Sequence, residues 1–292
     1  MPDFIEDFWF TSSDGLRHHA LSAGRRSEDR SPVICLPGIS RTAEDFRTLL
    51  KAFIENGPPR QVLALDSRGR GLSQYDSNPA NYSIPIELGD LVKLLGEQEI
   101  ERAIFIGTSR GGLLTMTLAS IMPQAIAGAV LNDIGPVIEM AGLLRIKGYV
   151  GKMNPPRSWP EAIASLKKVM GAQFPAFNEQ DWESYARRTW SDSFKPLSDP
   201  ALAEAFQGID ASTPPPTLWP QFEILAKAAP VLVIRGEHSD LLSRETADEM
   251  KRRGKNIVAI EIAGQGHAPI IEHTEITAQI LRFVERCDRQ IR

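Results

Sequence analysis

The amino-acid sequence predicts an α/β fold, in which helices wind both faces of a parallel sheet and a helical segment is inserted late in the chain. Three observations carry this prediction. Short apolar runs alternate with helical patterns from Pro32 onward, a G-x-S-x-G pentapeptide separates one such strand from one such helix, and residues 135–219 contain no clear buried strand. The 292 residues, 42% of them hydrophobic and 24% charged, suffice for one large globular domain with an insertion.

The first 30 residues predict a β-hairpin. Two strand candidates, Ile5–Thr11 and Leu16–Ala23, flank the turn signal Ser13-Asp14-Gly15. The N-terminus, Met-Pro-Asp-Phe-Ile-Glu-Asp, is acidic and lacks the basic start and apolar core of a signal peptide. Apolar runs elsewhere are too short to span a membrane, so we expect a cytoplasmic protein without a membrane partner.

Strand and helix patterns then alternate up to about residue 134. The first helix, Thr42–Asn56, has Thr42 as its expected N-cap and Gly57 as its stop, and a later one ends before Pro123. The expected strands are Val33–Leu36, Val62–Leu65, Ala103–Ile106 and Ile126–Leu131, and the other expected helices are Pro85–Gln98 and Gly111–Met122. This order of elements is typical of a parallel sheet covered on both faces.

The alternation stops between about Gly135 and Trp219, and proline-rich stretches separate helical patterns there. These helices are expected at Glu161–Met170, Glu179–Trp190 and Ala201–Phe206. Alternation returns with Val231–Ile234, Arg244–Arg253, Ile257–Ile262 and Ile271–Cys287. We therefore expect residues 1–134 and 220–292 to form the core domain and residues 135–219 to form a helical cap, or lid.

The pentapeptide Gly107-Thr108-Ser109-Arg110-Gly111 is the strongest functional signal. Strand, sharp turn and helix in succession are the context of a nucleophile elbow, which exposes a serine hydroxyl above the sheet. A glycine-rich turn without chemistry is the alternative, so partners for Ser109 must decide. A serine hydroxyl is a weak nucleophile at neutral pH and needs a general base that is itself oriented by a carboxylate.

His267 is the expected base. It lies in a loop directly after the last predicted strand, at the sheet edge where the elbow also lies. The other histidines fit less well, because His18 and His19 lie on the hairpin and His273 lies in or at the start of the last helix. We expect ester turnover to rise with pH as His267 loses its proton.

The loop after Val231–Ile234 is expected to supply the carboxylate. It offers Glu237 and Asp240, and we favour Asp240 because apolar Leu241 and Leu242 follow it, whereas Glu237 is expected to face solvent or brace the loop. Asp133, after the strand Ile126–Leu131, is the alternative acid; it could instead cap its own turn. The order serine, acid, histidine along the chain holds for either aspartate.

Two backbone N–H groups are expected to bind the oxyanion of a tetrahedral intermediate. One belongs to Arg110, directly after the nucleophile, and the other to Ile39, in the loop Leu36-Pro37-Gly38-Ile39-Ser40 after the first parallel strand. A plain strand-to-helix turn is the alternative for this loop. The side chain of Arg110 is expected in a surface salt bridge; contact with an acidic substrate group is the alternative.

These motifs together resemble the α/β-hydrolase family. The resemblance rests on residues 36–38, the run DSRGRGLS at 66–73, the Ser109 elbow, the run GEHSD at 236–240 and Gly266-His267, and it extends from about Val33 to the C-terminus apart from the insertion. In detail the chain resembles the capped serine esterase and lactonase group, including proteins called methyl-ester carboxylesterase-like. The resemblance implies a mostly parallel eight-stranded sheet with an antiparallel second strand, a cap domain and a Ser–Asp–His triad. Pro37 departs from the histidine that many relatives carry there, and Ser109 excludes the aspartate nucleophile of dehalogenase-like members.

The predicted activity is hydrolysis of carboxylic esters through an acyl-enzyme on Ser109. Lactones, thioesters and carbon–carbon bonds of β-diketones are alternative substrates, and a non-catalytic ligand-binding receptor on the same scaffold is an alternative of another class. Aromatic residues concentrate in the insertion, which favours a small to medium, moderately hydrophobic substrate. They are Tyr149, Trp159, Phe174, Phe177, Trp182, Tyr185, Trp190, Phe194, Phe206 and Trp219.

Composition excludes several other classes. The net charge is −4 and no run of Lys or Arg marks a nucleic-acid-binding surface. Cys35 and Cys287 are too few and too distant for a disulfide framework. No set of histidines has zinc-ligand spacing, so we expect neither a metal nor a cofactor. The sequence does not indicate an oligomeric state.

Overall fold

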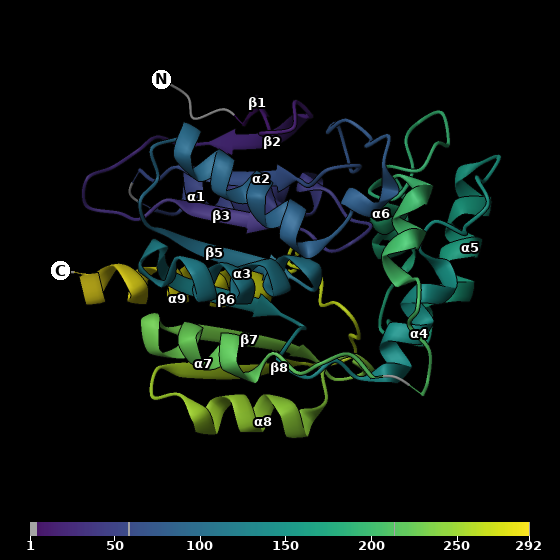
Figure 1. Ribbon diagram of the computed structural model, residues 1–292. Coiled ribbons are helices and arrows are strands. Elements are labelled where there is room, and N and C mark those ends of the chain that lie inside the picture. Colours follow the sequence, from purple (N-terminus) through teal and green to yellow (C-terminus); the bar gives the residue numbers. More distant parts are fainter. Residues whose placement is uncertain (1–4, 58, 213, 292) are drawn as a thin grey trace.

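The computed structural model describes residues 5–57, 59–212 and 214–291 (Figure 1). Residues 1–4, which open the acidic N-terminal stretch considered above, lie outside the described residues. Eight strands form one sheet in the order β1-β2-β4-β3-β5-β6-β7-β8. The strands are β1 (Glu6–Thr11), β2 (Arg17–Ala23), β3 (Val33–Leu36), β4 (Val62–Asp66), β5 (Ala103–Thr108), β6 (Ile126–Asn132), β7 (Val231–Gly236) and β8 (Ile257–Ile262).

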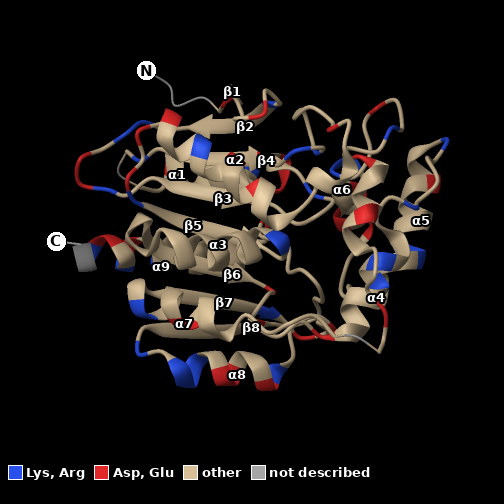
Figure 2. Cartoon of the chain, in the orientation of Figure 1, with Lys and Arg blue, Asp and Glu red and all other residues tan. Residues whose placement is uncertain are grey.

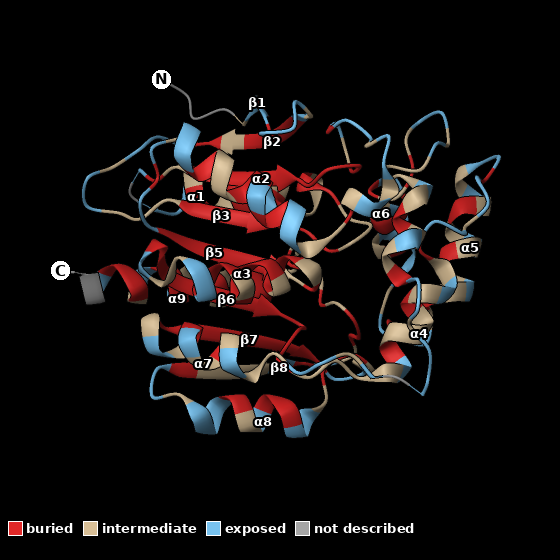
Figure 3. Ribbon diagram, in the orientation of Figure 1, coloured by how far each residue is buried: buried red, intermediate tan, exposed pale blue. Residues whose placement is uncertain are grey.

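The sheet confirms the expected topology. β2 pairs antiparallel with both β1 and β4, whereas the pairs from β4 to β8 are all parallel. Every residue of β3, β4, β6 and β7 is buried, as Figure 3 also shows. These strands are continuously apolar because helices cover both faces of a parallel sheet.

Two hydrophobic clusters, one on each face, hold the helices against the sheet. The first includes α2 (Ile84–Glu97), α3 (Arg110–Ile121), α7 (Trp219–Ala228) and α8 (Arg244–Arg253), and the second includes α1 (Arg47–Glu55) and α9 (Thr274–Ile291). In Figure 1, α2, α3 and α7 lie in front of the sheet and α9 lies behind it. Figure 2 shows most charged residues on the outer sides of helices and in loops.

Several helix boundaries differ from expectation. The helix expected over Thr42–Asn56 is a 3₁₀ turn, η1 (Ala43–Phe46), followed by α1; the Thr42 side chain caps η1 by accepting from the Glu44 backbone N–H, as predicted. Two helices, α4 (Met140–Tyr149) and α7, were missed. Gly142 weakens the helical signal of α4, yet a Cβ there would lie 2.6 Å from the Asp240 carbonyl oxygen, so packing requires the glycine.

The segment between β6 and α7 lies beyond the carboxyl ends of the strands, at the right of Figure 1. It contains α4, α5 (Trp159–Met170), α6 (Glu179–Arg187) and the 3₁₀ helix η4 (Pro200–Phe206). A third cluster of buried side chains belongs mainly to this segment and includes Phe174, Trp182 and Trp190. Most aromatic rings of this segment therefore pack on one another.

Both cysteines are buried and unpaired. Within the described ranges, no helix combines the length and the apolar character needed to cross a bilayer.

Candidate active site

Ser109 lies at the turn between β5 and α3 with a backbone conformation rare for a side-chain-bearing residue. Its φ is 50° and its ψ is −113°. Such strained conformations persist only where the surroundings enforce them, and they cluster at functional sites. Here the Ser109 N–H donates to the Asn132 carbonyl on β6, while the Ser109 carbonyl accepts from the Gly112 N–H. The turn therefore fixes the hydroxyl at the carboxyl end of the sheet.

The two glycines of the pentapeptide permit this tight turn. A Cβ on Gly107 would lie 2.5 Å from the Gly111 carbonyl carbon, and a Cβ on Gly111 would lie 2.1 Å from the Leu36 carbonyl oxygen. No side chain can occupy either space without moving the backbone of β3 or α3. The close approach of strand and helix therefore requires glycine at both positions.

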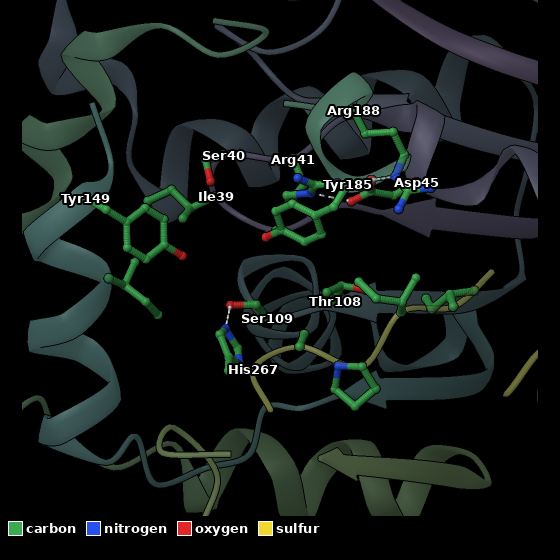
Figure 4. A pocket seen from close by; sticks show the side chains of 16 residues that line it. Ile39, Ser40, Arg41, Asp45, Thr108, Ser109, Tyr149, Tyr185, Arg188 and His267 are labelled. Atoms are coloured by element: carbon green, nitrogen blue, oxygen red, sulfur yellow. Dashed lines mark hydrogen bonds and ion pairs between the residues drawn. The ribbon is translucent and has the colours of Figure 1, made fainter. Parts of the chain in front are cut away.

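His267 contacts Ser109 directly. It lies in the loop after β8, and its Nε2 is 2.9 Å from Ser109 Oγ, the bond drawn in Figure 4. Its Nδ1 is 2.9 Å from Asp133 Oδ2. Since Nδ1 faces a carboxylate, Nδ1 carries the proton and Nε2 is left free to accept one from the serine hydroxyl.

Asp133, the alternative acid, is the carboxylate that meets His267. It directly follows β6, is fully buried, and has a φ of 55°. Its Oδ1 accepts from the Gly236 N–H at 2.8 Å, and its Oδ2 accepts from the Ser239 hydroxyl at 2.6 Å. These neutral donors hold the side chain in one orientation, with the remaining lone pairs of Oδ2 toward the imidazole.

Asp240, which the sequence favoured, lies elsewhere and the assignment needs correction. Its carboxylate forms a two-bond pair with Arg145 of α4, at 2.6 and 2.7 Å, and 24% of its side chain is exposed. The physical reason is sheet order. β6 lies beside β5, so the first residue after β6 already reaches the elbow, whereas Asp240 stands four positions beyond the end of β7, where the chain has turned toward α4.

Glu237 also has a structural role, since its carboxylate accepts from the Gly264 N–H at 2.8 Å and braces the loop before His267, as expected.

The loop after β3 passes beside Ser109. A Cβ on Gly38 would lie 3.8 Å from the Ser109 Cβ, so the Gly38–Ile39 peptide borders the serine side chain. The buried Arg70 guanidinium donates to the Ile39 carbonyl at 2.6 Å and to Glu87 at 3.0 Å. Glu87 in turn accepts from the Arg110 side chain at 2.9 and 3.0 Å. The buried Glu87 carboxylate therefore links Ile39, through Arg70, to Arg110. These are the two residues whose backbone N–H groups are expected to bind an oxyanion.

The same network shows whether the Arg110 side chain forms a salt bridge or faces the pocket. It pairs with Glu87 and with the Tyr82 carbonyl, and it does not line the pocket around Ser109. The pair is a salt bridge, as expected, but it is mostly buried and not at the surface: Glu87 is 2% exposed. Burial opposes ionisation of Glu87, but Arg70 and Arg110 outweigh it and lower the pKa of this carboxyl.

A pocket opens above Ser109 and His267 (Figure 4). Its walls come from the loop after β3, from the segment after His267 and from the insertion between β6 and α7. Ile146, Ile270 and Ile271 supply apolar surface, while Tyr149 and Tyr185 are the insertion's aromatic residues that reach it. Behind these tyrosines and Arg41 lies a second hollow, lined by Met153, Leu166 and Trp190 among others.

A family model described as "Alpha/beta hydrolase family" matches residues 33–280. The chain belongs to the alpha/beta hydrolase family. The predicted resemblance and fold class are thereby confirmed, and the protein is an enzyme related to esterases.

Among curated relatives of this hydrolase, a 3-hydroxybutyrate-oligomer hydrolase of Cupriavidus necator is 32% identical over 81% of the chain and 82% of that protein. Esterase YbfF of Escherichia coli is 25% identical over 90% of the chain and 94% of that protein. A crystal structure of an alpha/beta hydrolase from Novosphingobium aromaticivorans is 40% identical, has a TM-score of 0.89, and covers 97% of this chain and 98% of that one.

A residue that the sequence did not reveal supports the histidine loop of the hydrolase. Gln173, between α5 and α6, accepts from the His267 backbone N–H at 2.8 Å and is itself buried. A Cβ on Gly266 would lie 2.2 Å from the same amide oxygen, which explains the glycine before the histidine. No short motif marks Gln173, because the contact joins residues 94 positions apart.

No group of three or more potential metal ligands occurs among the described residues. The adjacent His18 and His19 of β2 do not converge on one site. The His19 ring lies 2.7 Å from Asp66, whereas His18 lies near Asp90 on the other face of β2.

Proposed function

We propose that this hydrolase is a serine esterase whose triad is Ser109, His267 and Asp133. The observation that carries the proposal is the pair of 2.9 Å contacts on the two ring nitrogens of His267, one to the serine and one to the buried carboxylate. A hydroxyl, an imidazole and a carboxylate in this order form the arrangement that activates serine for acyl transfer.

The proposed reaction proceeds through an acyl-enzyme. Ser109 Oγ attacks the ester carbonyl carbon while His267 Nε2 takes the hydroxyl proton, and Asp133 remains ionised and stabilises the imidazolium. The negative oxygen that develops accepts from the N–H groups of Ile39 and Arg110. Collapse of the intermediate expels the alcohol, which receives the proton from His267. A water molecule, deprotonated by the same imidazole, then attacks the acyl carbon, and the acid leaves as His267 returns the proton to Ser109 Oγ.

We propose that residues 135–219 act as a cap over this site, set on a core of residues 1–134 and 220–292. Ile146, Tyr149, Tyr185 and Arg188 come from that segment and line the pocket above the nucleophile. Gln173 of the same segment supports the His267 backbone. A cap that excludes water strengthens electrostatic interactions in the site.

The relatives are consistent with ester substrates. One is named a 3-hydroxybutyrate-oligomer hydrolase and another an esterase, and oligomers of a hydroxy acid are joined by ester bonds. Lactones, thioesters and β-diketones use the same triad chemistry, so a side-by-side comparison of these substrates with simple esters ranks them.

A fluorophosphonate probe tests the proposal directly. We expect stoichiometric labelling of Ser109 and loss of both labelling and ester turnover in Ser109→Ala. Ser120→Ala, an exposed serine on the same helix α3, is the matched control and should behave as wild type. Absence of labelling in the folded wild-type protein would contradict the proposal and favour a non-catalytic binding protein on the same scaffold.

A further inference from the structure

Two arginines stand on one side of the pocket, across from the triad. Figure 4 shows Arg41 and Arg188 both directed toward Asp45, with the Tyr185 ring between Arg41 and Ser109. Arg41 comes from the core loop after β3, and Arg188 directly follows α6 in the insertion. Both line the pocket, and Arg188 is nine-tenths buried.

Asp45 accounts for only part of this positive charge. Its two oxygens accept from Arg41 Nε and Nη2 at 2.8 and 2.6 Å, and Oδ1 also lies 3.3 Å from Arg188 Nε. Asp45 is the only acidic side chain among the residues that line this pocket in the described chain, so the lining carries two guanidiniums and one carboxylate. Glu272, which pairs with Arg188 from outside the lining, balances the charge of the second guanidinium.

The second acidic partner of Arg188 lies outside the pocket. Glu272 binds Arg188 Nη1 and lines a separate surface hollow with Phe177 and His273. Arg188 Nη1 also donates to Ser184 Oγ at 3.0 Å, whereas Arg188 Nη2 donates to no described residue. Asp45, Glu272 and Ser184 thus hold the Arg188 guanidinium in place, while its Nη2 keeps N–H donors for a ligand.

Such a group suits an anion with a planar, two-oxygen acceptor. Guanidinium N–H groups match carboxylate oxygens in spacing and direction, and bonds between charged partners are the stronger kind. The apolar walls formed by Ile146, Ile270 and Ile271 exclude water and strengthen the attraction. The hydroxyls of Tyr149 and Tyr185 point into the space above Ser109 in Figure 4, on the other side of the Tyr185 ring from Arg188, where they can donate to the rest of the substrate.

We infer that the hydrolase selects esters that carry a carboxylate on their acyl or alcohol part, and that Arg188 binds this carboxylate while Ser109 attacks the ester. This inference rests on the proposed esterase function and adds the class of substrate. A neutral ester of equal size leaves the Arg188 donors without an acceptor, so it gains less from the site.

Matched pairs of acid and amide substrates test the inference. Monoethyl succinate and ethyl succinamate differ in charge on the acyl side, and 3-acetoxybutanoate and 3-acetoxybutanamide differ on the alcohol side. We expect kcat/KM to be at least about tenfold higher for the acid of one pair, as a charge-assisted hydrogen bond provides. Added salt should raise KM for the acid more than for the amide.

Variants then locate the effect. Arg188→Gln should reduce the acid-to-amide ratio toward one, and Arg188→Lys should retain part of it because the charge remains. Arg187→Gln is the matched control, since Arg187 is half-exposed, pairs with Glu183 and does not line the pocket; its ratio should equal that of wild type. If Arg188 variants do not fold, competitive inhibition of wild type by butyrate but not by butyramide supports the inference, and equal inhibition opposes it.

The outcomes separate the two proposals. Equal kcat/KM for acid and amide in both pairs would overturn the inference and leave the esterase function standing. An acid-to-amide ratio that survives Arg188→Gln unchanged would also overturn the assignment of the arginine. Failure to hydrolyse any ester, with no fluorophosphonate labelling, would refute the proposed function and the inference with it.

Discussion

Replacing Asp133 by asparagine tests which carboxylate orients His267. The asparagine side chain has nearly the same shape, so the change removes the charge and turns one acceptor into a donor. In the structure, Oδ1 accepts from the Gly236 N–H, so the amide oxygen of the variant belongs at that position. The amide nitrogen then occupies the position of Oδ2, where it faces His267 Nδ1 and the Ser239 hydroxyl.

The consequence for the imidazole is the wrong tautomer. A donor opposite Nδ1 requires Nδ1 to accept, which places the proton on Nε2, and Nε2 can then no longer accept from Ser109. In a serine protease with the same arrangement, this exchange lowers kcat by about 10⁴-fold. The same loss here corresponds to about 5.4 kcal/mol of activation free energy. We therefore expect a fall in kcat of about three to four orders of magnitude for Asp133→Asn.

Asp240→Asn is the control that distinguishes the two aspartates. Its pair with Arg145 is partly exposed, and such pairs contribute at most about 1 kcal/mol to stability. We expect kcat within about threefold of wild type, because no contact joins Asp240 to His267. The assay is hydrolysis of 4-nitrophenyl butyrate, with thermal unfolding to establish that both variants are folded. A larger loss in Asp240→Asn than in Asp133→Asn would refute the geometric reasoning.

Three further perturbations address the supports of the site. Gln173→Ala removes the acceptor of the His267 N–H and should lower kcat about tenfold, with recovery in Gln173→Glu; unchanged kcat in steady-state assays would contradict the contact. Gly111→Ala should lower the free energy of unfolding in urea by at least about 3 kcal/mol. Gly89 is exposed and helical with open space at its Cβ position, so Gly89→Ala should raise the free energy of unfolding by about 0.5–1 kcal/mol. Similar effects at both positions would argue against a close approach of strand and helix at Gly111. Burial opposes the charged form of His19, but Asp66 and Asp7 outweigh it and raise its pKa above 6.5. The stability advantage of wild type over His19→Asn should therefore be full below pH 6.5 and shrink as pH rises through the folded value; urea titrations showing a constant difference would disagree.

The sequence by itself determined the sheet, and it singled out Ser109 and His267, the proposed nucleophile and base. Continuous apolar runs identified β3, β5 and β6, because only strands buried on both faces are apolar throughout. Gly107 and Gly111 marked the elbow by their spacing: Gly107 is crowded by Gly111 four positions on, although Gly111 itself is crowded by Leu36 of β3. His267 was found because it follows a strand, and the carboxyl ends of parallel strands meet at one edge.

Only the tertiary structure decided which aspartate meets His267 and which residues of the insertion reach the pocket. Asp133 and Asp240 both follow strands, and chain order alone does not say which strand lies beside β5 or which loop turns back toward α4. Gln173 and Arg188 were invisible for the same reason: each acts through contacts with residues more than 80 positions away. Local patterns record what neighbouring residues must do, whereas long-range side-chain contacts exist only after the sheet has set the order of its strands.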